Sequence, residues 1–158
     1  MARFWDTSAV IPLVVREPET TRVLALLQND QSMIVWWDTQ LECVSALARG
    51  VREGRLATTD ETHARTALEL LIGSWSEIQP TQRVRAIAER LLRVHSLRAA
   101  DALQLASALV WSDGVPERQE FVCLDVRLRE AAHKEGFLVE PSDSALPPSN
   151  PYRGSPGP

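Results

Sequence analysis

The sequence predicts an α/β fold in which a five-stranded parallel sheet lies between two layers of helices. Short apolar segments rich in β-branched and aromatic residues alternate with segments whose apolar residues recur at helical spacing. Strands separated by helices pair in parallel and are covered on both faces. A length of 158 residues fits one domain, and 44% hydrophobic residues supply a substantial core.

Five segments are expected to form the strands. They are residues 2–6, 33–37, 76–79, 120–124 and 137–140. Each is short and apolar or β-rich, and the segment 76–79 is closed by Pro80. A proline at the end of a strand favours the edge of a sheet, so this segment is expected to be an edge strand.

Helices are expected between these strands. The first, from Ser8 to Arg16, should be interrupted by Pro12, which a helix tolerates only in its first turn. Thr39 and Glu42 have the spacing of a capping box and open another helix. Further helices are expected from about residues 18, 58, 81, 98 and 126.

The composition changes after residue 140. Residues 141–158 contain six Pro and two Gly and have little apolar surface to bury. Such a segment cannot offset its ordering entropy. We therefore expect one globular domain over residues 1–140, followed by a disordered tail over residues 141–158.

Charge and cysteine usage constrain the class of protein. Seventeen basic and 21 acidic residues give a net charge of −4, without the global basic footprint of many nucleic-acid-binding proteins. Nucleic acid is not excluded, because cations bound at an acidic site would offset its charge locally. Cys43 and Cys123 form no CxxC motif and are expected to be reduced thiols. No apolar stretch matches a membrane span or signal peptide, so a soluble cytoplasmic protein is expected.

Four acidic residues lie where strand and helix patterns change over: Asp6, Glu42, Asp101 and Asp125. Strand ends in an α/β sheet meet at one crevice, so these carboxylates can converge. Converging carboxylates repel one another unless they share protons or hold a cation. Oxygen ligands suit Mg²⁺ or Mn²⁺, which predicts a metal site.

Each of these acids also has an ordinary structural interpretation. Asp6 and Asp125 could cap the helices that follow them, and Glu42 could complete the capping box described above. Asp101 could form a salt bridge with Arg98 in the same helical turn. Capping and metal binding are compatible in one residue, so these alternatives remain open.

Four segments of the chain resemble PIN-domain proteins. Residues 4–9 (FWDTSA) resemble the opening strand motif, and residues 41–47 (LECVSAL) resemble the second acidic element. Residues 97–106 (LRAADALQLA) are similar to the third, and residues 121–136 to the closing strand, aspartate and helix. Order, spacing and size agree over residues 1–140. The size and the helical region between the second and third elements resemble VapC-type toxins of toxin–antitoxin pairs.

The resemblance implies an Mg²⁺- or Mn²⁺-dependent endoribonuclease with strand order 3-2-1-4-5. Its acidic quartet would be Asp6, Glu42, Asp101 and Asp125, with Thr7 or Ser8 supporting the first carboxylate. It further implies an RNA substrate, a small cognate antitoxin protein and a homodimer.

One position departs from the family pattern. Cys123 stands two residues before Asp125, where Thr or Ser is common, and a thiol is a poorer hydrogen-bond donor. Alternatives are a housekeeping PIN-domain nuclease, a non-catalytic RNA-binding module and a small-molecule phosphohydrolase. The last usually needs a second Asp two residues after the first, where this chain has Ser8.

Overall fold

The computed structural model describes residues 1–142 and is built on a five-stranded parallel sheet. The strand order is β3-β2-β1-β4-β5, and every neighbouring pair is parallel. The strands are β1 (Arg3–Trp5), β2 (Met33–Trp36), β3 (Ser76–Ile78), β4 (Glu120–Val122) and β5 (Leu138–Glu140). This confirms the predicted fold class, and β3 is an edge strand as expected.

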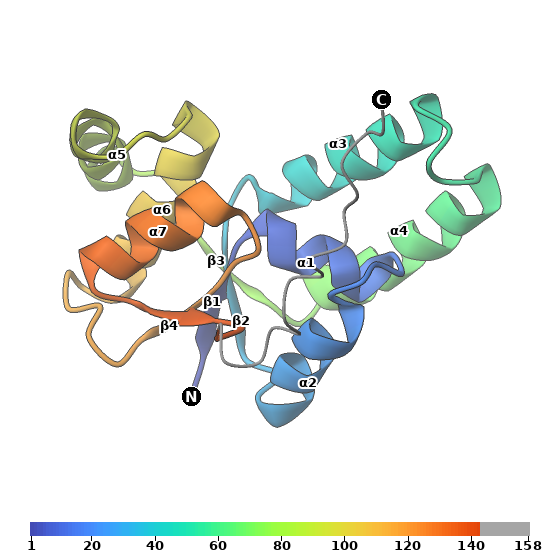
Figure 1. The fold of residues 1–158 in the computed structure, drawn as a ribbon, viewed down its shortest axis with the longest axis horizontal. Coiled ribbons are helices and arrows are strands. Elements are labelled where there is room, and N and C mark those ends of the chain that lie inside the picture. Colours follow the sequence, from blue (N-terminus) through green and yellow to red (C-terminus); the bar gives the residue numbers. More distant parts are fainter. Residues whose placement is uncertain (143–158) are drawn as a thin grey trace, which may run out of the picture.

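Two groups of helices cover the two faces of the sheet. The helices are α1 (Thr7–Val14), α2 (Thr20–Asn29), α3 (Thr39–Arg52), α4 (Thr58–Ile72), α5 (Gln82–Val94), α6 (Ala99–Trp111) and α7 (Val126–Glu135). Figure 1 shows α5, α6 and α7 on one side of the strands and α1 to α4 on the other. Within residues 1–142, no helix combines the length and apolar character needed to cross a bilayer.

The central strands are apolar on both faces, and successive side chains enter opposite layers. Phe4 packs with residues of α5, α6 and α7, whereas Trp5 packs with residues of α1 to α4. Both side chains are completely buried. Phe4 stacks on Phe121 of β4 with ring centroids 5.4 Å apart. Such double-sided burial is typical of parallel sheets covered by helices.

Helix α1 continues through Pro12, so the predicted interruption is wrong. A proline inside a helix loses one hydrogen bond, here to the carbonyl of Ser8. Pro12 is buried, and its carbonyl oxygen accepts a hydrogen bond from the Thr20 hydroxyl at 2.8 Å. In a helix of eight residues, these contacts with the rest of the fold outweigh one missing backbone bond.

The boundary between domain and tail was predicted at residue 141. Pro141 is buried, and its carbonyl oxygen accepts a hydrogen bond from Arg129 Nη2 at 2.8 Å. The remainder of the predicted tail, residues 143–158, lies outside the described residues. The disorder expected for it therefore stays a prediction.

Candidate metal centre

All four predicted acidic residues line one cavity of about 480 Å³. Asp6 follows β1 and Asp125 follows the β4 segment, while Glu42 and Asp101 lie near the starts of α3 and α6. The carboxyl ends of the parallel strands meet at this edge, which is why residues distant in sequence converge. The structure thus brings together the residues that the sequence singled out.

Asp6 is held in place by the start of α1. It is the N-cap residue, and its Oδ2 accepts hydrogen bonds from the Ser8 backbone N–H at 3.0 Å and from the Ser8 hydroxyl. Only 5% of Asp6 is exposed. Burial raises the pKa of this carboxyl, the two bonds from Ser8 partly offset that effect, and the charge of Asp101 adds to it.

The Ser8 hydroxyl joins two parts of the cavity. It donates to Asp6 and accepts hydrogen bonds from the backbone N–H groups of Leu124 at 2.9 Å and Asp125 at 3.3 Å. Cys123 Sγ lies 3.7 Å from Asp6 Oδ2 and 3.6 Å from Ser8 Oγ. Ser8 therefore supplies the strong bond to Asp6, and the thiol is a weaker neighbour.

Glu42 faces the cavity and does not complete a capping box. Helix α3 begins at Thr39 itself, its N-cap is Asp38, and the cap makes no side-chain bond. Thr39 is fully buried at the first helical position. Burial, followed by the negative charge of Asp6, raises the pKa of Glu42 to about 7.

Gln104 is a site residue that the sequence reading missed. Its side chain is 1% exposed, one helical turn after Asp101. Its Nε2 lies 2.9 Å from Thr7 Oγ1, 3.2 Å from Thr39 Oγ1 and 3.2 Å from Glu42 Oε1. One amide therefore ties α6 to α1 and α3 beside the acids. The available signal was a polar residue inside an apolar helical run, which needs buried partners.

Asp101 and Asp125 each cap a helix with one carboxylate oxygen. Asp101 Oδ2 accepts from the backbone N–H of Arg98 at 3.3 Å, and the described residues contain no salt bridge between these two side chains. Asp125 is exposed, and its Oδ1 accepts from the Leu128 N–H at 2.9 Å. The second oxygen of each carboxylate has no hydrogen bond to a described residue, so both can reach a ligand.

The donors suit a hard cation in kind. They are carboxylate oxygens, and they influence one another: Asp101 raises the pKa of Asp6, and Asp6 raises that of Glu42. Gln104 Oε1 is also buried without a hydrogen-bond partner among the described residues. No three His, Cys, Asp or Glu side chains of residues 1–142 stand in an arrangement that could hold a metal ion. The cavity therefore offers oxygen ligands but no preformed coordination shell.

The raised pKa of Glu42 predicts a pH-dependent stability for the metal-free protein. Between pH 4.5 and about 7, the folded state keeps a proton that unfolded Glu42 has lost. Stability falls with rising pH wherever the native state binds more protons, so the melting temperature in chelator should decrease across this window.

Glu42→Gln should reduce this pH dependence, and the raised pKa of Asp6 should account for part of what remains. Exposed Glu89→Gln is the matched control and should behave as wild type. Thermal melts at several pH values test the expectation. A wild-type curve as flat as that of Glu42→Gln would contradict it.

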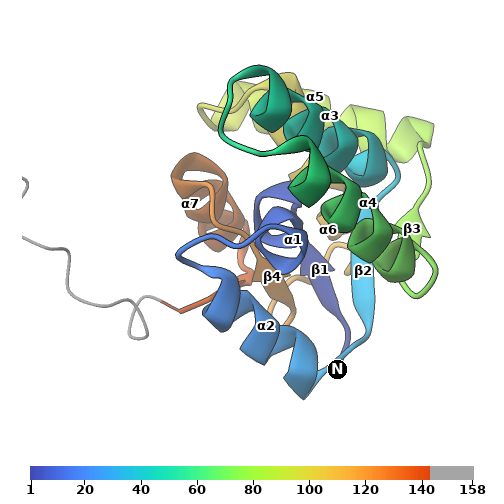
Figure 2. The same ribbon diagram turned by 90° about the vertical axis from the view of Figure 1, so that its right-hand side faces the viewer.

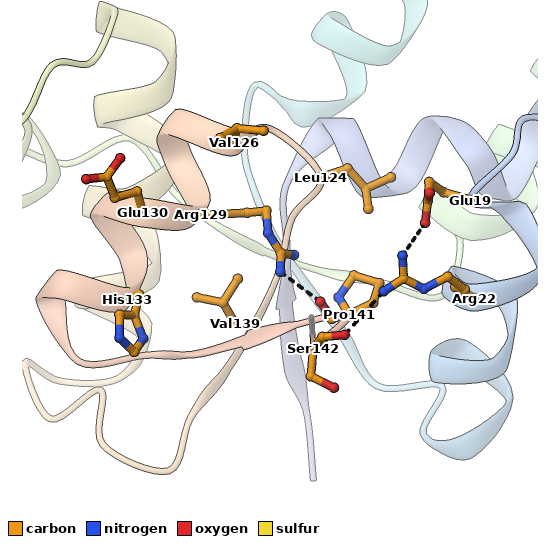
Figure 3. Close-up of a pocket in the computed structure, with 10 residues that line it drawn as sticks. All are labelled: Glu19, Arg22, Leu124, Val126, Arg129, Glu130, His133, Val139, Pro141 and Ser142. Atoms are coloured by element: carbon orange, nitrogen blue, oxygen red, sulfur yellow. Dashed lines mark hydrogen bonds and ion pairs between the residues drawn. The ribbon is translucent and has the colours of Figure 1, made fainter. Parts of the chain in front are cut away.

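A second cavity, of about 570 Å³, lies between α2, α7 and the end of β5 and contains none of the four acids. Figure 3 shows its two arginines turned toward neighbouring groups. Arg22 donates to Glu19 at 2.7 Å and to the Ser142 carbonyl at 3.3 Å. Arg129 donates to the carbonyls of Cys123 and Pro141. These cations hold the segment around Pro141 and Ser142 against α2 and α7, which indicates a structural role.

Known proteins share the sequence pattern and the fold of this chain. The sequence profile of the PIN domain matches residues 3–113. The chain belongs to the PIN-domain family. The matched region includes Asp6, Glu42 and Asp101 of the cavity and ends before Asp125.

The sequence is also similar to a ribonuclease, VapC45 of Mycobacterium tuberculosis. The two are 29% identical over 139 residues, which cover 88% of this chain and 94% of the relative. This similarity confirms the resemblance of this PIN-domain protein to VapC-type toxins.

Solved structures share the fold. FitAcB from Neisseria gonorrhoeae has a TM-score of 0.60 at 19% identity and covers 88% of this chain and 96% of its own. VapBC2 from Rickettsia felis, solved with a DNA fragment from its promoter, has a TM-score of 0.61 at 11% identity over 89% and 98% of the two chains. At these identities the likeness establishes the fold alone.

Proposed function

We propose that this PIN-domain protein is an Mg²⁺- or Mn²⁺-dependent endoribonuclease and the toxin of a type II toxin–antitoxin pair. The convergence of Asp6, Glu42, Asp101 and Asp125 in one cavity carries the proposal. The ribonuclease name of the mycobacterial relative supports RNA as the substrate. A chain of this family with four carboxylates lining one cavity fits metal-assisted phosphodiester hydrolysis.

Asp6 and Asp101 are the proposed core ligands, and Glu42 and Asp125 complete the site directly or through water. When bound, the ion would activate a water molecule and offset charge on the scissile phosphate. Ser8 keeps Asp6 oriented, and Gln104 keeps Glu42 beside it. Glu42 is half-buried in the cavity beside these ligands, so it is placed to act as a general base when it is not ligated.

The proposed partners are RNA, a small cognate antitoxin and a second copy of this chain, in the cytoplasm. The Rickettsia felis structure contains VapBC2 bound to a DNA fragment from its promoter, which supports an antitoxin partner by analogy. A housekeeping nuclease and a non-catalytic RNA-binding module are the alternatives. A phosphohydrolase is disfavoured, because position 8 holds Ser and not the second Asp that such an enzyme usually needs two residues after the first.

Metal addition is the direct test of the site. Mn²⁺ or Mg²⁺ should raise the melting temperature, because a ligand at a hundred times its Kd stabilises the folded state by about 2.7 kcal/mol. The same ions should start cleavage of a cellular RNA pool, and chelator should stop it. A melting curve that no metal concentration moves would contradict the metal site.

Expression in cells separates the toxin from its alternatives. The protein alone should slow growth, and the neighbouring reading frame should restore it. Harmless overexpression of a protein that cleaves RNA when purified would favour a housekeeping nuclease. RNA binding without cleavage under any metal condition would favour the binding module.

A further inference from the structure

The acidic cavity continues into a groove between α1 and α3 that ends among arginines. On α1 the lining residues are Thr7, Ser8 and Ile11, and Val15 is the C-cap of this helix. On α3 the lining residues are Glu42, Ala46, Leu47, Arg49 and Gly50, most of which share a face. Arg16, which follows the C-cap of α1, and Arg55 complete the far end. Figure 2 shows α1 and α3 as neighbours on the same side of the sheet.

The turn after α3 builds the far end of this groove. The Gly50 carbonyl accepts hydrogen bonds from the backbone N–H groups of Arg55 at 2.9 Å and Leu56 at 3.1 Å. A Cβ at Gly50 would lie 3.3 Å from the Leu56 Cβ, so glycine permits this close return of the chain. The turn brings Arg55 and Leu56 alongside the last turn of α3.

The arginines at the far end differ in whether they form ion pairs. Arg55 is paired with Glu53 at 2.5 Å. Arg16 and Arg49 are exposed, and neither forms a hydrogen bond or ion pair with another side chain of residues 1–142. Glu17 and Glu53 are the acids there: burial raises the pKa of Glu17, with the charge of Arg55 partly offsetting this, and the hydrogen bond from Arg55, helped by the charge of Arg49, lowers the pKa of Glu53. Arg16 and Arg49 nevertheless make no hydrogen bond to an acid of residues 1–142, so their guanidinium groups can donate to a ligand.

We propose that this groove binds the RNA strand beside the cleaved bond, with Arg16 and Arg49 contacting phosphates away from the metal centre. The inference rests on the proposed ribonuclease function and deepens it. Helix α1 has eight residues, so its ends lie about 12 Å apart. The arginines therefore contact phosphates further along the strand than the scissile one.

The groove matches single-stranded RNA better than an acidic peptide. Its floor and walls between the charged ends are apolar, formed by Ile11, Val15, Ala46, Leu47 and Leu56. Sugars and bases can pack there while phosphates reach guanidinium groups, which bind them well. An acidic peptide would meet the same four carboxylates, but the proposed nuclease function already places an RNA strand at that end of the groove.

Charge-removing variants test the groove. Binding of a short fluorescein-labelled single-stranded RNA is measured in an Asp101→Asn background, so that the RNA stays intact. Arg16→Gln and Arg49→Gln should each weaken binding roughly tenfold at low salt and reduce the slope of log K against log salt by about 0.7. Arg52→Gln is the matched control, because Arg52 is exposed on α3 but does not line the groove.

Cleavage kinetics provide a second measurement in the otherwise wild-type protein. Contacts to distant phosphates are made equally in the ground and transition states, so both variants should raise KM and leave kcat near wild type. If both variants match Arg52→Gln in affinity and salt slope, the groove assignment is wrong. Equally strong competition by poly-L-glutamate would also overturn it, in favour of an acidic protein partner.

These results separate the two proposals. Binding that weakens as expected in a protein that never cleaves RNA would support the groove and refute the nuclease function. Cleavage with metal by all three variants at equal KM would support the nuclease and refute the groove.

Discussion

Replacing Asp6 by Asn is expected to reduce RNA cleavage by roughly a thousandfold while leaving the fold intact. Asn keeps the size of the side chain and can still accept the Ser8 backbone N–H, but it removes a ligand charge. A catalytic metal supplies several kcal/mol of transition-state stabilisation, and about 1.4 kcal/mol corresponds to tenfold in rate. Because burial already raises the pKa of Asp6, the neutral variant should melt higher than wild type in chelator.

For the other three acids, the loss of RNA cleavage on substitution should depend on the position of each acid in the cavity. Asp101→Asn should match Asp6→Asn, because the charge of Asp101 acts directly on the Asp6 carboxyl. Glu42→Gln should be intermediate, and exposed Asp125→Asn the mildest.

Initial rates of cleavage of a structured RNA pool, with RNA binding measured in parallel, provide the test. Exposed Asp60→Asn is the control and should cleave as wild type. RNA binding by Asp6→Asn should be unchanged or tighter, since a charge that repels phosphate is gone. Equal rates for wild type and Asp101→Asn would place the chemistry elsewhere.

The architecture was predictable because its determinants are local. Buried strands and amphipathic helices leave clear periodic patterns, and parallel pairing follows from their alternation. The convergence of the acids followed from the same topology, since strand ends share one edge of the sheet. This is why residues as distant as Asp6 and Asp125 could be placed in one cavity before the structure was known.

The details that the sequence predicted wrongly depend on contacts between residues far apart in the sequence. Thr39 and Glu42 have capping-box spacing, yet α3 begins at Thr39 and both side chains contact Gln104 from α6. Helix α1 passes through Pro12 because the surrounding fold, and not the local backbone, decides its course. Sequence spacing carries no information about such tertiary partners.

Ser8 shows how a departure from a family pattern can be compensated. Cys123 stands two residues before Asp125, where Thr or Ser is common in the family, and the sequence alone suggested weaker support for the metal site from this strand. In the structure the Ser8 hydroxyl bonds both Asp6 and the backbone after β4. The thiol is a second neighbour at 3.7 Å, so the support for Asp6 comes mainly from its own helix.

Replacing Gln104 by Met is expected to lower both stability and cleavage, because the amide NH2 lies within hydrogen-bond distance of three acceptors in the site and can donate to two of them at a time. Met fills a similar volume but cannot donate to Thr7, Thr39 or Glu42. Leaving buried polar groups without partners costs about 1–3 kcal/mol of folding free energy. With Glu42 no longer held by α6, kcat should fall roughly tenfold to a hundredfold, as it does when a reacting geometry is misplaced slightly.

Two controls separate positioning from simple loss of stability. Gln40→Met lies on the exposed face of α3 and should change neither property. Leu91→Ala removes a fully buried side chain from α5 and should destabilise by about 2–5 kcal/mol, yet keep wild-type kcat at temperatures where it is folded. Thermal melts and single-turnover rates with Mn²⁺ measure both effects. Gln104→Met cleaving as fast as Leu91→Ala under folded conditions would show that Gln104 supports the fold and does not position Glu42.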